Sequence, residues 1–329
     1  MSSGTAVVAL CGGVGGAKLA RGLTHVLPAE DLTIIVNTGD DFQHLGLHIS
    51  PDLDSVMYAL AGLSDPVRGW GRRDESWIFM EALRGLGAES WFQLGDRDLA
   101  VHIERSWRLA AGATLSQVTA HLCRALDIPT RVLPMSDDPV HTRLLTSEGW
   151  LDFQHYFVRR RCQPVIQQIT FAGAATARPQ PAALAALHSP GLRAVIICPS
   201  NPFVSIEPIL ALAPLRAALE QCAAPVLAVT PIIAGQAVKG PAAKMMRELG
   251  LEVSAASVAT RYEPLIDGFV LEEADAIPAT SGVHFFGAPT LMRTLEDEAR
   301  LAQRVLQAAD SLSAGTISPA PQTTGEHHG

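Results

Sequence analysis

A glycine-rich segment near the N-terminus is the first feature of the sequence that could do chemistry. Residues 12–18 read GGVGGAK and stand between an apolar run and a run with helical character; they contribute Gly12, Gly13, Gly15, Gly16 and Lys18. Glycine lets the backbone approach a ligand closely, and the free N–H groups at the start of a helix attract an anion. The segment is not a Walker A loop, which needs Gly-Lys-Ser/Thr, because Lys18 follows Ala17 and precedes Leu19. It is not a complete GxGxxG either, because Lys18 stands where the last glycine would be. We therefore predict a phosphate site, with a tight turn that binds no ligand as the alternative.

Four aspartates follow the second predicted strand, residues 32–36, within fifteen residues of one another: Asp40, Asp41, Asp52 and Asp54. Mg²⁺ is commonly held by one or two carboxylates together with the phosphates of a substrate. Capping of the helix predicted to begin at Asp52 would explain that residue alone. The cluster beside a glycine-rich turn therefore favours a magnesium site over solvated side chains.

Further polar groups lie at the ends of predicted strands and helices. Ser200 and Asn201 follow an apolar run, and Lys239 and Gly240 precede a helix that starts with proline, which makes a second possible anion site. Arg97 lies between Asp96 and Asp98, either of which could cap the helix predicted to begin there. Arg97 could therefore bind the substrate or form an ion pair with one of these neighbours.

Composition limits the class of protein. The 329 residues are 48% hydrophobic and 18% charged, with a formal net charge of −8, so neither nucleic acid nor an anionic membrane is expected as a partner. Five scattered cysteines form no CxxC pair, no signal peptide is evident, and no apolar run reaches the roughly 20 residues of a membrane span. No GxSxG motif is present, which weighs against covalent hydrolase chemistry. We expect a cytoplasmic protein.

The order of apolar runs predicts an α/β fold. Short β-branched runs alternate with helical ones, which is typical of a Rossmann-like, mostly parallel sheet with helices on both faces. Residues 1–63 and 170–311 are assigned to this core. Residues 64–169 are assigned to an inserted cap of helices and a β-hairpin that turns at 147–149, and residues 312–329 to a disordered tail.

The motifs in combination resemble one enzyme family. GGVGGAK, NTGDDFQHLGLHISPDLDSV, LGDRD, LPMSDDPV, CPSNPFVS and TPIIAGQAVKGPAAK occur in this order within residues 6–310. Together they are similar to the 2-phospho-L-lactate transferases of coenzyme F(420) biosynthesis, the CofD/FbiA group. The resemblance implies a Rossmann-like core with a smaller added domain and a homodimer. It also implies transfer of a phospho-acid from a guanosine diphospho-acid donor to the ribityl hydroxyl of the deazaflavin Fo, with release of GMP and formation of F(420)-0 or its dehydro form.

The resemblance also implies roles for individual residues. Asp40 and Asp54 are the first candidates for catalysis and for Mg²⁺, and Asp41 and Asp52 are the second candidates for the metal. Replacing Asp40 or Asp54 by alanine is expected to reduce turnover by orders of magnitude and to leave the fold intact. The acid of the donor stays open among phospholactate, phosphoenolpyruvate and phosphoglycerate.

The remaining implied roles concern the two substrates. The nucleotide is assigned to Gly12, Gly13, Gly15, Gly16, Lys18, Ser200, Asn201, Lys239 and Gly240, and the deazaflavin to Asp54, Gln93 and Arg97. Gln93 stands where some relatives have lysine. The flat ring of the deazaflavin needs apolar side chains on either side. The candidates for this role, which could instead be ordinary core residues, are Trp70, Trp77, Trp91 and Phe92.

Two other functions remain as alternatives. A nucleotide-sugar-binding regulator would share the glycine-rich turn but is expected to have a different second loop and no Fo-binding cap. The PDLD, LGDRD and SNP segments favour the transferase. A nicotinamide-dependent oxidoreductase is disfavoured because Asn37 occupies the position of the acid that would bind the ribose.

Overall fold

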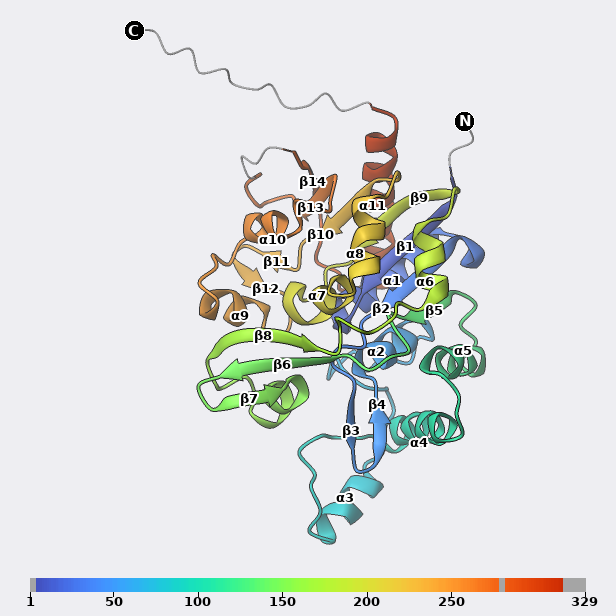
Figure 1. Cartoon of the computed structure of the whole chain (residues 1–329), viewed down its shortest axis with the longest axis vertical. Helices are drawn as coiled ribbons and strands as arrows, with labels where there is room; N and C mark the ends of the chain where they lie inside the picture. Colours follow the sequence, from blue (N-terminus) through green and yellow to red (C-terminus); the bar gives the residue numbers. More distant parts are fainter. Residues whose placement is uncertain (1–3, 278–281, 316–329) are drawn as a thin grey trace.

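The centre of the protein is a seven-stranded sheet in which every adjacent pair of strands is parallel (Figure 1). The computed structural model describes residues 4–277 and 282–315. In spatial order the strands are β14 (His284–Ala288), β13 (Gly268–Glu272), β10 (Val226–Val229), β9 (Leu192–Ile197), β1 (Ala6–Cys11), β2 (Leu32–Val36) and β5 (Arg131–Pro134). The α/β fold predicted from the sequence is confirmed.

Both faces of the sheet are buried, and each has its own apolar core. Alternate side chains of β1 point to opposite faces: Val7 and Ala9 to one core, Val8 and Leu10 to the other. The first core is covered by α1 (Gly13–Val26), α2 (Pro51–Leu60), α5 (Leu115–Ala125) and α11 (Leu295–Ser313). The second is covered by α6 (Pro181–Leu187), α7 (Glu207–Leu210), α8 (Ala213–Glu220), α9 (Ala242–Glu248) and α10 (Ala255–Tyr262).

The strand order reverses direction at the middle of the sheet. From β1 the chain builds outward through β2 and β5 on one side, and then through β9, β10, β13 and β14 on the other. The crevice at the carboxyl ends of β1 and β9 is therefore the place where such sheets bind ligands.

Smaller elements surround this crevice. A hairpin of β3 (Phe42–His44) and β4 (Leu47–Ile49) follows β2, and β6 (His141–Thr146), β7 (Gly149–Asp152) and β8 (Ile166–Ala172) form an antiparallel sheet. The helices α3 (Ile78–Gly85) and α4 (Asp96–Ala110) lie on the side of β3 and β4, and α3 is at the end of the molecule opposite α11 (Figure 1). A short pair, β11 (Ile232–Ile233) and β12 (Gln236–Ala237), precedes α9.

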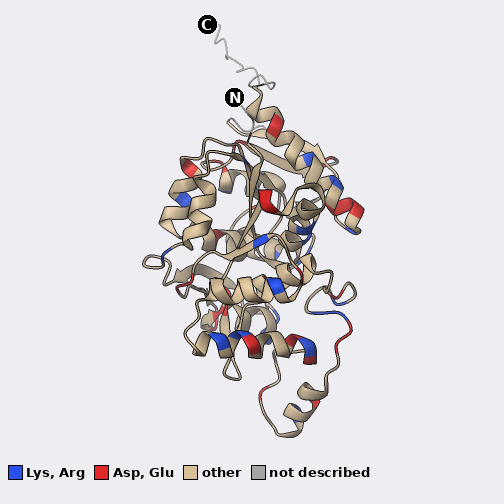
Figure 2. Ribbon diagram, turned by 90° about the vertical axis from the view of Figure 1, so that its right-hand side faces the viewer, with Lys and Arg blue, Asp and Glu red and all other residues tan. Residues whose placement is uncertain are grey.

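Short turns complete the chain. A 3₁₀ turn spans Ala29–Asp31, and π-type turns span His155–Arg159 and Pro202–Ile206. Basic and acidic residues are interspersed along the surface helices (Figure 2). Within residues 4–277 and 282–315, no single helix has the length and apolarity to cross a membrane; one pair bent by 88°, 202–210 with 213–220, meets those two criteria.

The predicted cap differs from the structure in two strands. Residues 170–172, assigned to the core, are the end of β8, which pairs with β6 in the antiparallel sheet. Residues 131–134 were assigned to the insertion, yet β5 pairs with β2 and so belongs to the main sheet. The predicted hairpin is present as β6 and β7, which pair around residues 147 and 148. Residues 312 and 313 of the predicted tail are the last turn of α11, because the helix ends only at Ser313; residues 316–329 lie outside the described residues.

Candidate active site

A cavity of about 590 Å³ lies at the carboxyl ends of β1, β2 and β9. Pockets for small ligands commonly have about 300–1,000 Å³. Gly15 and Asp54 both line it, so the glycine-rich turn and the acidic segment converge on one space. Residues from outside the sheet close its other side, among them Trp70, Phe92 and Phe157.

The glycine-rich turn forms the first turn of α1 itself. Gly13 begins the helix with φ of +62°, a conformation that favours glycine. A Cβ on Gly15 would lie 2.5 Å from the carbonyl oxygen of Pro199, so the turn packs directly on the loop after β9. The N–H of Gly12 donates to Ser200 Oγ over 3.1 Å. Glycine is therefore needed here for close backbone packing as well as for access to the cavity.

Asp40 and Asp52 form the acidic side of the cavity. The Asn37 Nδ2 amide donates to Asp40 Oδ1 over 3.2 Å and to Asp52 Oδ2 over 2.9 Å, and thus bridges the two carboxylates. Gln154 Nε2 donates to Asp40 Oδ2 over 3.0 Å, and the Gly13 N–H donates to Asp52 Oδ1 over 2.6 Å. Each carboxylate is therefore held by neutral donors only.

The electrostatics of this pair suit a cation. Burial and the charges of Asp52 and Asp41 hold the pKa of the Asp40 carboxyl well above its usual value. Burial also raises the pKa of Asp52 to about 6, against the hydrogen bonds from Asn37 and Gly13. A divalent cation between them would remove this repulsion. Within the described ranges no three Asp, Glu, His or Cys side chains form a complete metal cage, so a bound Mg²⁺ would need oxygens from a ligand as well.

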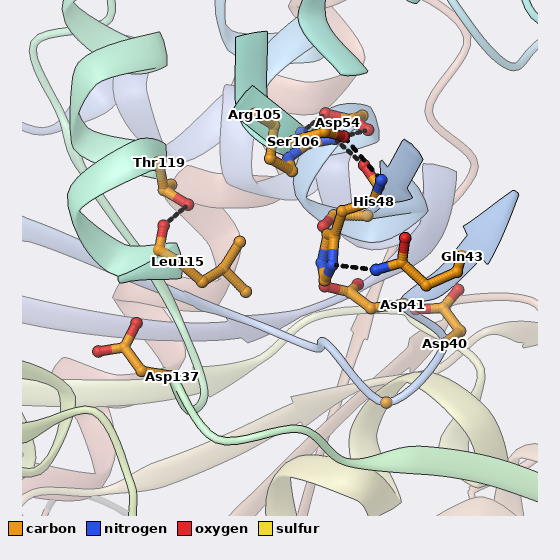
Figure 3. Close-up of polar contacts among 12 residues, drawn as sticks. Asp40, Asp41, Gln43, His48, Asp54, Arg105, Ser106, Leu115, Thr119 and Asp137 are labelled. Atoms are coloured by element: carbon orange, nitrogen blue, oxygen red, sulfur yellow. Dashed lines mark hydrogen bonds and ion pairs between the residues drawn. The ribbon is translucent and has the colours of Figure 1, made fainter. Parts of the chain in front are cut away.

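Asp41 and Asp54 are engaged differently. Asp41 is buried outside the cavity lining, where Ser50 Oγ donates to its Oδ2 over 2.8 Å and His48 Nε2 lies 3.2 Å from the same atom. Asp54 faces the buried Arg105, which donates to both of its carboxylate oxygens (Figure 3). The charge of Asp54 is therefore compensated by a guanidinium. We retain Asp40 and Asp52 as the residues that fit a metal and assign Asp54 to holding Arg105.

Comparison with known proteins identifies the family. The profile described as "2-phospho-L-lactate transferase CofD" matches residues 7–282. The chain belongs to this family. A phosphoenolpyruvate transferase of Kitasatospora aureofaciens is 41% identical over 322 residues, which cover 94% of this chain and 99% of that protein. The 2-phospho-L-lactate transferase of Methanosarcina mazei is 39% identical over 306 residues, covering 92% and 100%.

The solved structures agree on the fold. A UPF0052-family protein from Bacillus halodurans superposes with a TM-score of 0.61 at 15% identity, covering 93% of this chain and 99% of that one. At this identity the likeness concerns the fold alone. The family match makes the chain a transferase of coenzyme F(420) biosynthesis, as its motifs predict.

Most residues predicted to bind the nucleotide of the transferase line the cavity. They are Gly12, Gly13, Gly15, Lys18, Ser200, Asn201, Lys239 and Gly240. Gly16 does not line it, because the place of a side chain there is taken by Ser200 Oγ, 2.2 Å from an ideal Cβ. Lys18 Nζ donates to the Met292 carbonyl over 2.6 Å, and Lys239 Nζ to the Gly69 carbonyl over 3.0 Å.

The residues predicted to bind the deazaflavin divide into two groups. Gln93, Trp70 and Phe92 line the cavity together with Asp54. Arg97 is exposed and outside the lining, and Trp77 and Trp91 are also outside it. Arg97 is therefore not positioned as a clamp, because it lies on the surface and does not line the cavity.

The sequence reasoning missed several lining residues. Phe153 and Phe157, whose rings stack 5.4 Å apart, come from the cap and line the cavity. Tyr58, Asp98 and His102 line it as well. The spacing of Asp98 and His102, four residues apart in a predicted helix, was a signal that they share one helix face.

Proposed function

We propose that this chain transfers the phospho-acid part of a guanosine diphospho-acid donor to the ribityl hydroxyl of Fo and releases GMP. The observation that carries the proposal is that the glycine-rich turn, the Asp40–Asp52 pair and a set of aromatic side chains share one cavity. The first two suit a diphosphate with its cation, and the third suits a flat ring system.

The donor is assigned to the α1 side of the cavity. Backbone N–H groups at the start of α1 and the ammonium groups of Lys18 and Lys239 supply positive potential for phosphate oxygens. Burial and the charge of Lys18 lower the pKa of Lys239. An anion between these two lysines would relieve their repulsion, which supports a phosphate at this position.

The acceptor is assigned to the cap side. Trp70, Phe92 and Phe157 offer apolar faces there, and Gln93 offers an amide. Phosphoryl transfer between oxygens depends mainly on positioning and on neutralising charge. A Mg²⁺ held by Asp40 and Asp52 would neutralise the diphosphate of the donor, while the chain itself aligns the two substrates and excludes water.

The test is product formation with a defined donor. The protein is incubated with Fo, Mg²⁺ and one of three guanosine diphospho-acids, carrying phospholactate, phosphoenolpyruvate or phosphoglycerate, and the products are separated and weighed by mass spectrometry. Formation of GMP together with an Fo product heavier by the phospho-acid supports the proposal. Absence of both with every donor would favour a nucleotide-binding regulator instead.

The identity of the acid is part of the same experiment. The relatives at 41%, 39% and 38% identity from Kitasatospora and two Streptomyces are named phosphoenolpyruvate transferases. We therefore propose phosphoenolpyruvate as the preferred acid. Competition among equimolar donors checks it, and a dominant phospholactate product would contradict it.

We also propose a homodimer, as the family resemblance implies. Ile103 and Trp107, one turn apart on α4, are 50% and 62% exposed, and an interface would remove such apolar side chains from water. Sedimentation equilibrium should give twice the chain mass of 35.0 kDa. A monomer at micromolar concentration would contradict this part.

A further inference from the structure

Asp98 is a buried carboxylate on the acceptor side of the cavity. It lies in the first turn of α4 and lines the cavity together with Tyr58 of α2 and His102 of α4. The Tyr58 hydroxyl donates to Asp98 Oδ1 over 2.5 Å, and His102 Nε2 lies 3.3 Å from the same oxygen. One carboxylate oxygen therefore faces both neighbours.

The second oxygen of Asp98 is available to a ligand. In the part of the chain that the structure describes, Asp98 Oδ2 accepts no hydrogen bond, and the side chain keeps 12% of its surface exposed in a residue that lines the cavity. Asp54 has no such vacancy, because Arg105 donates to both of its oxygens. Of the two carboxylates here, only Asp98 has an oxygen that no protein donor contacts among the described residues.

His102 lies between Asp98 and Arg105. Arg105 Nη1 lies 3.2 Å from His102 Nδ1, and because a guanidinium can only donate, Nδ1 is the acceptor of this contact. The other ring nitrogen, Nε2, lies 3.3 Å from Asp98 Oδ1 and makes no hydrogen bond there among the described residues. The ring thus packs against Asp98, and Asp54 in turn holds Arg105.

Helix capping does not account for Asp98. Acids in the first turn of a helix often cap it. Here Glu75 does this, since its carboxylate accepts from the N–H groups of Arg97 and Asp98 over 2.8 and 2.9 Å. Burial alone would raise the pKa of Asp98, but the nearby His102 ring, the hydrogen bond from the Tyr58 hydroxyl and the charge of Arg105 hold it below its usual value. Asp98 is therefore ionised at neutral pH.

We propose that Asp98 Oδ2 accepts the hydrogen of the attacking hydroxyl of the acceptor, with Tyr58 and His102 as positioning residues. The inference rests on the proposed function. As the new O–P bond forms and the bond from phosphorus to the GMP oxygen breaks, the hydroxyl proton passes to Asp98. It leaves to water when the product departs, so the carboxylate is restored.

The test compares Asp98→Asn with a matched control on the same helix. Glu104→Gln makes the same change at a partly exposed acid outside the cavity lining, whose partners are Arg108 and His121. We expect Asp98→Asn to lower kcat by about 10²- to 10⁴-fold, the usual range for loss of a proton acceptor, and to leave the KM for the donor within threefold. Glu104→Gln should keep the wild-type rate. A folded Asp98→Asn with a wild-type kcat would overturn the inference.

Tyr58→Phe provides a readout that a purely structural role would not move. It removes the hydroxyl that holds Asp98 ionised, so the pKa of Asp98 rises and the acidic limb of the pH–rate profile moves to higher pH. This variant decides the matter if Asp98→Asn does not fold, and an unmoved acidic limb would overturn the inference. Wild-type protein that forms no product with any donor would instead refute the proposed function, on which the inference depends.

Discussion

At the scale of single residues, the candidate site separates two kinds of buried carboxylate. Asp40 and Asp52 are held by the neutral amide of Asn37 and have no cationic partner, whereas Asp54 is paired with the guanidinium of Arg105. Uncompensated buried charge is costly unless a counter-ion binds. We therefore expect substitution of Asp40 to leave the fold intact and substitution of Asp54 to destabilise it.

Asp40→Asn should abolish the effect of Mg²⁺ on stability. Guanosine diphosphate with Mg²⁺ should raise the Tm of the wild-type protein, because a ligand that binds only the folded state stabilises it. The variant loses one carboxylate of the pair and should show no rise from Mg²⁺, while it keeps its fold without ligand. Thermal unfolding measures both, with Asp41→Asn, outside the cavity lining, as the control. A wild-type response of Asp40→Asn to Mg²⁺ would show that the metal assignment is wrong.

Asp54→Asn should destabilise the fold, in contrast to the expectation from sequence that substitution here is harmless to it. Arg105 is 1% exposed, and removing its partner leaves a buried charge unpaired, at a cost of about 3–5 kcal/mol. Adding Arg105→Met should recover much of the loss, because no charge is then left. Urea unfolding of the two single variants and the double variant measures this coupling. If the double variant lost as much stability as the two single variants together, the coupling between Asp54 and Arg105 would be contradicted.

At the scale of elements, α1 is positioned for the site by α11. Arg21 donates to both carboxylate oxygens of Glu298, over 2.6 and 2.7 Å, and Glu298 is fully buried. A Cβ on Gly22 would lie 2.2 Å from the Glu298 carbonyl oxygen, so the helices touch backbone to backbone. The start of α1, where the phosphate site is proposed, therefore depends on a helix about 280 residues later in the chain.

Gly22→Ala should separate α1 from α11. The added methyl group has no room, and such overpacking costs about 1–3 kcal/mol. The KM for the donor should rise as well, because the first turn of α1 moves. Gly85→Ala in α3 is the matched control: its Cβ meets nothing within 4 Å, and alanine there should stabilise the helix by up to about 1 kcal/mol. Equal unfolding midpoints for the two variants would contradict the close packing.

The capping of α11 predicts a pH dependence of stability. Backbone N–H groups of Thr294 and Arg293, with Arg300, lower the pKa of Asp297 to about 2. A carboxylate with a depressed pKa stabilises the fold above its unfolded pKa of about 3.9, and this contribution is lost as the pH falls toward 2. Asp297→Ala should therefore have a lower Tm than wild type at pH 7 and approach it between pH 4 and 2. A Tm difference that does not change with pH would contradict this.

At the scale of the whole molecule, the site lies where the sheet reverses direction and where the cap closes over it. The sequence predicts the sheet half well, because the glycine-rich turn and the acids after β2 follow strands whose carboxyl ends must meet. The part of the site that the cap contributes depends on contacts between residues far apart in the sequence, which no local pattern reveals. Gln154 reaches Asp40 across 114 positions, and Arg105 reaches Asp54 across 51.

The errors of the sequence reasoning have the same origin. The sequence alternates between apolar and polar residues from β5 into the β6–β7 hairpin, so β5 was predicted to belong to the hairpin and hence to the cap. In the structure it pairs with β2. Arg97 was a candidate because it lies in a polar motif, but the helix turns it outward and its neighbour Asp98 inward. Which face of α4 meets the cavity is decided by the packing of α4 against β4 and α5, and this packing is not encoded within the motif.

The most direct measurement of the central claim is an experimental structure of the protein with guanosine diphosphate, Mg²⁺ and Fo bound together. We predict phosphate oxygens at the backbone N–H groups that begin α1, the metal on Asp40 and Asp52, and the terminal ribityl hydroxyl beside Asp98. A diphosphate bound elsewhere, with this cavity empty, would contradict the account.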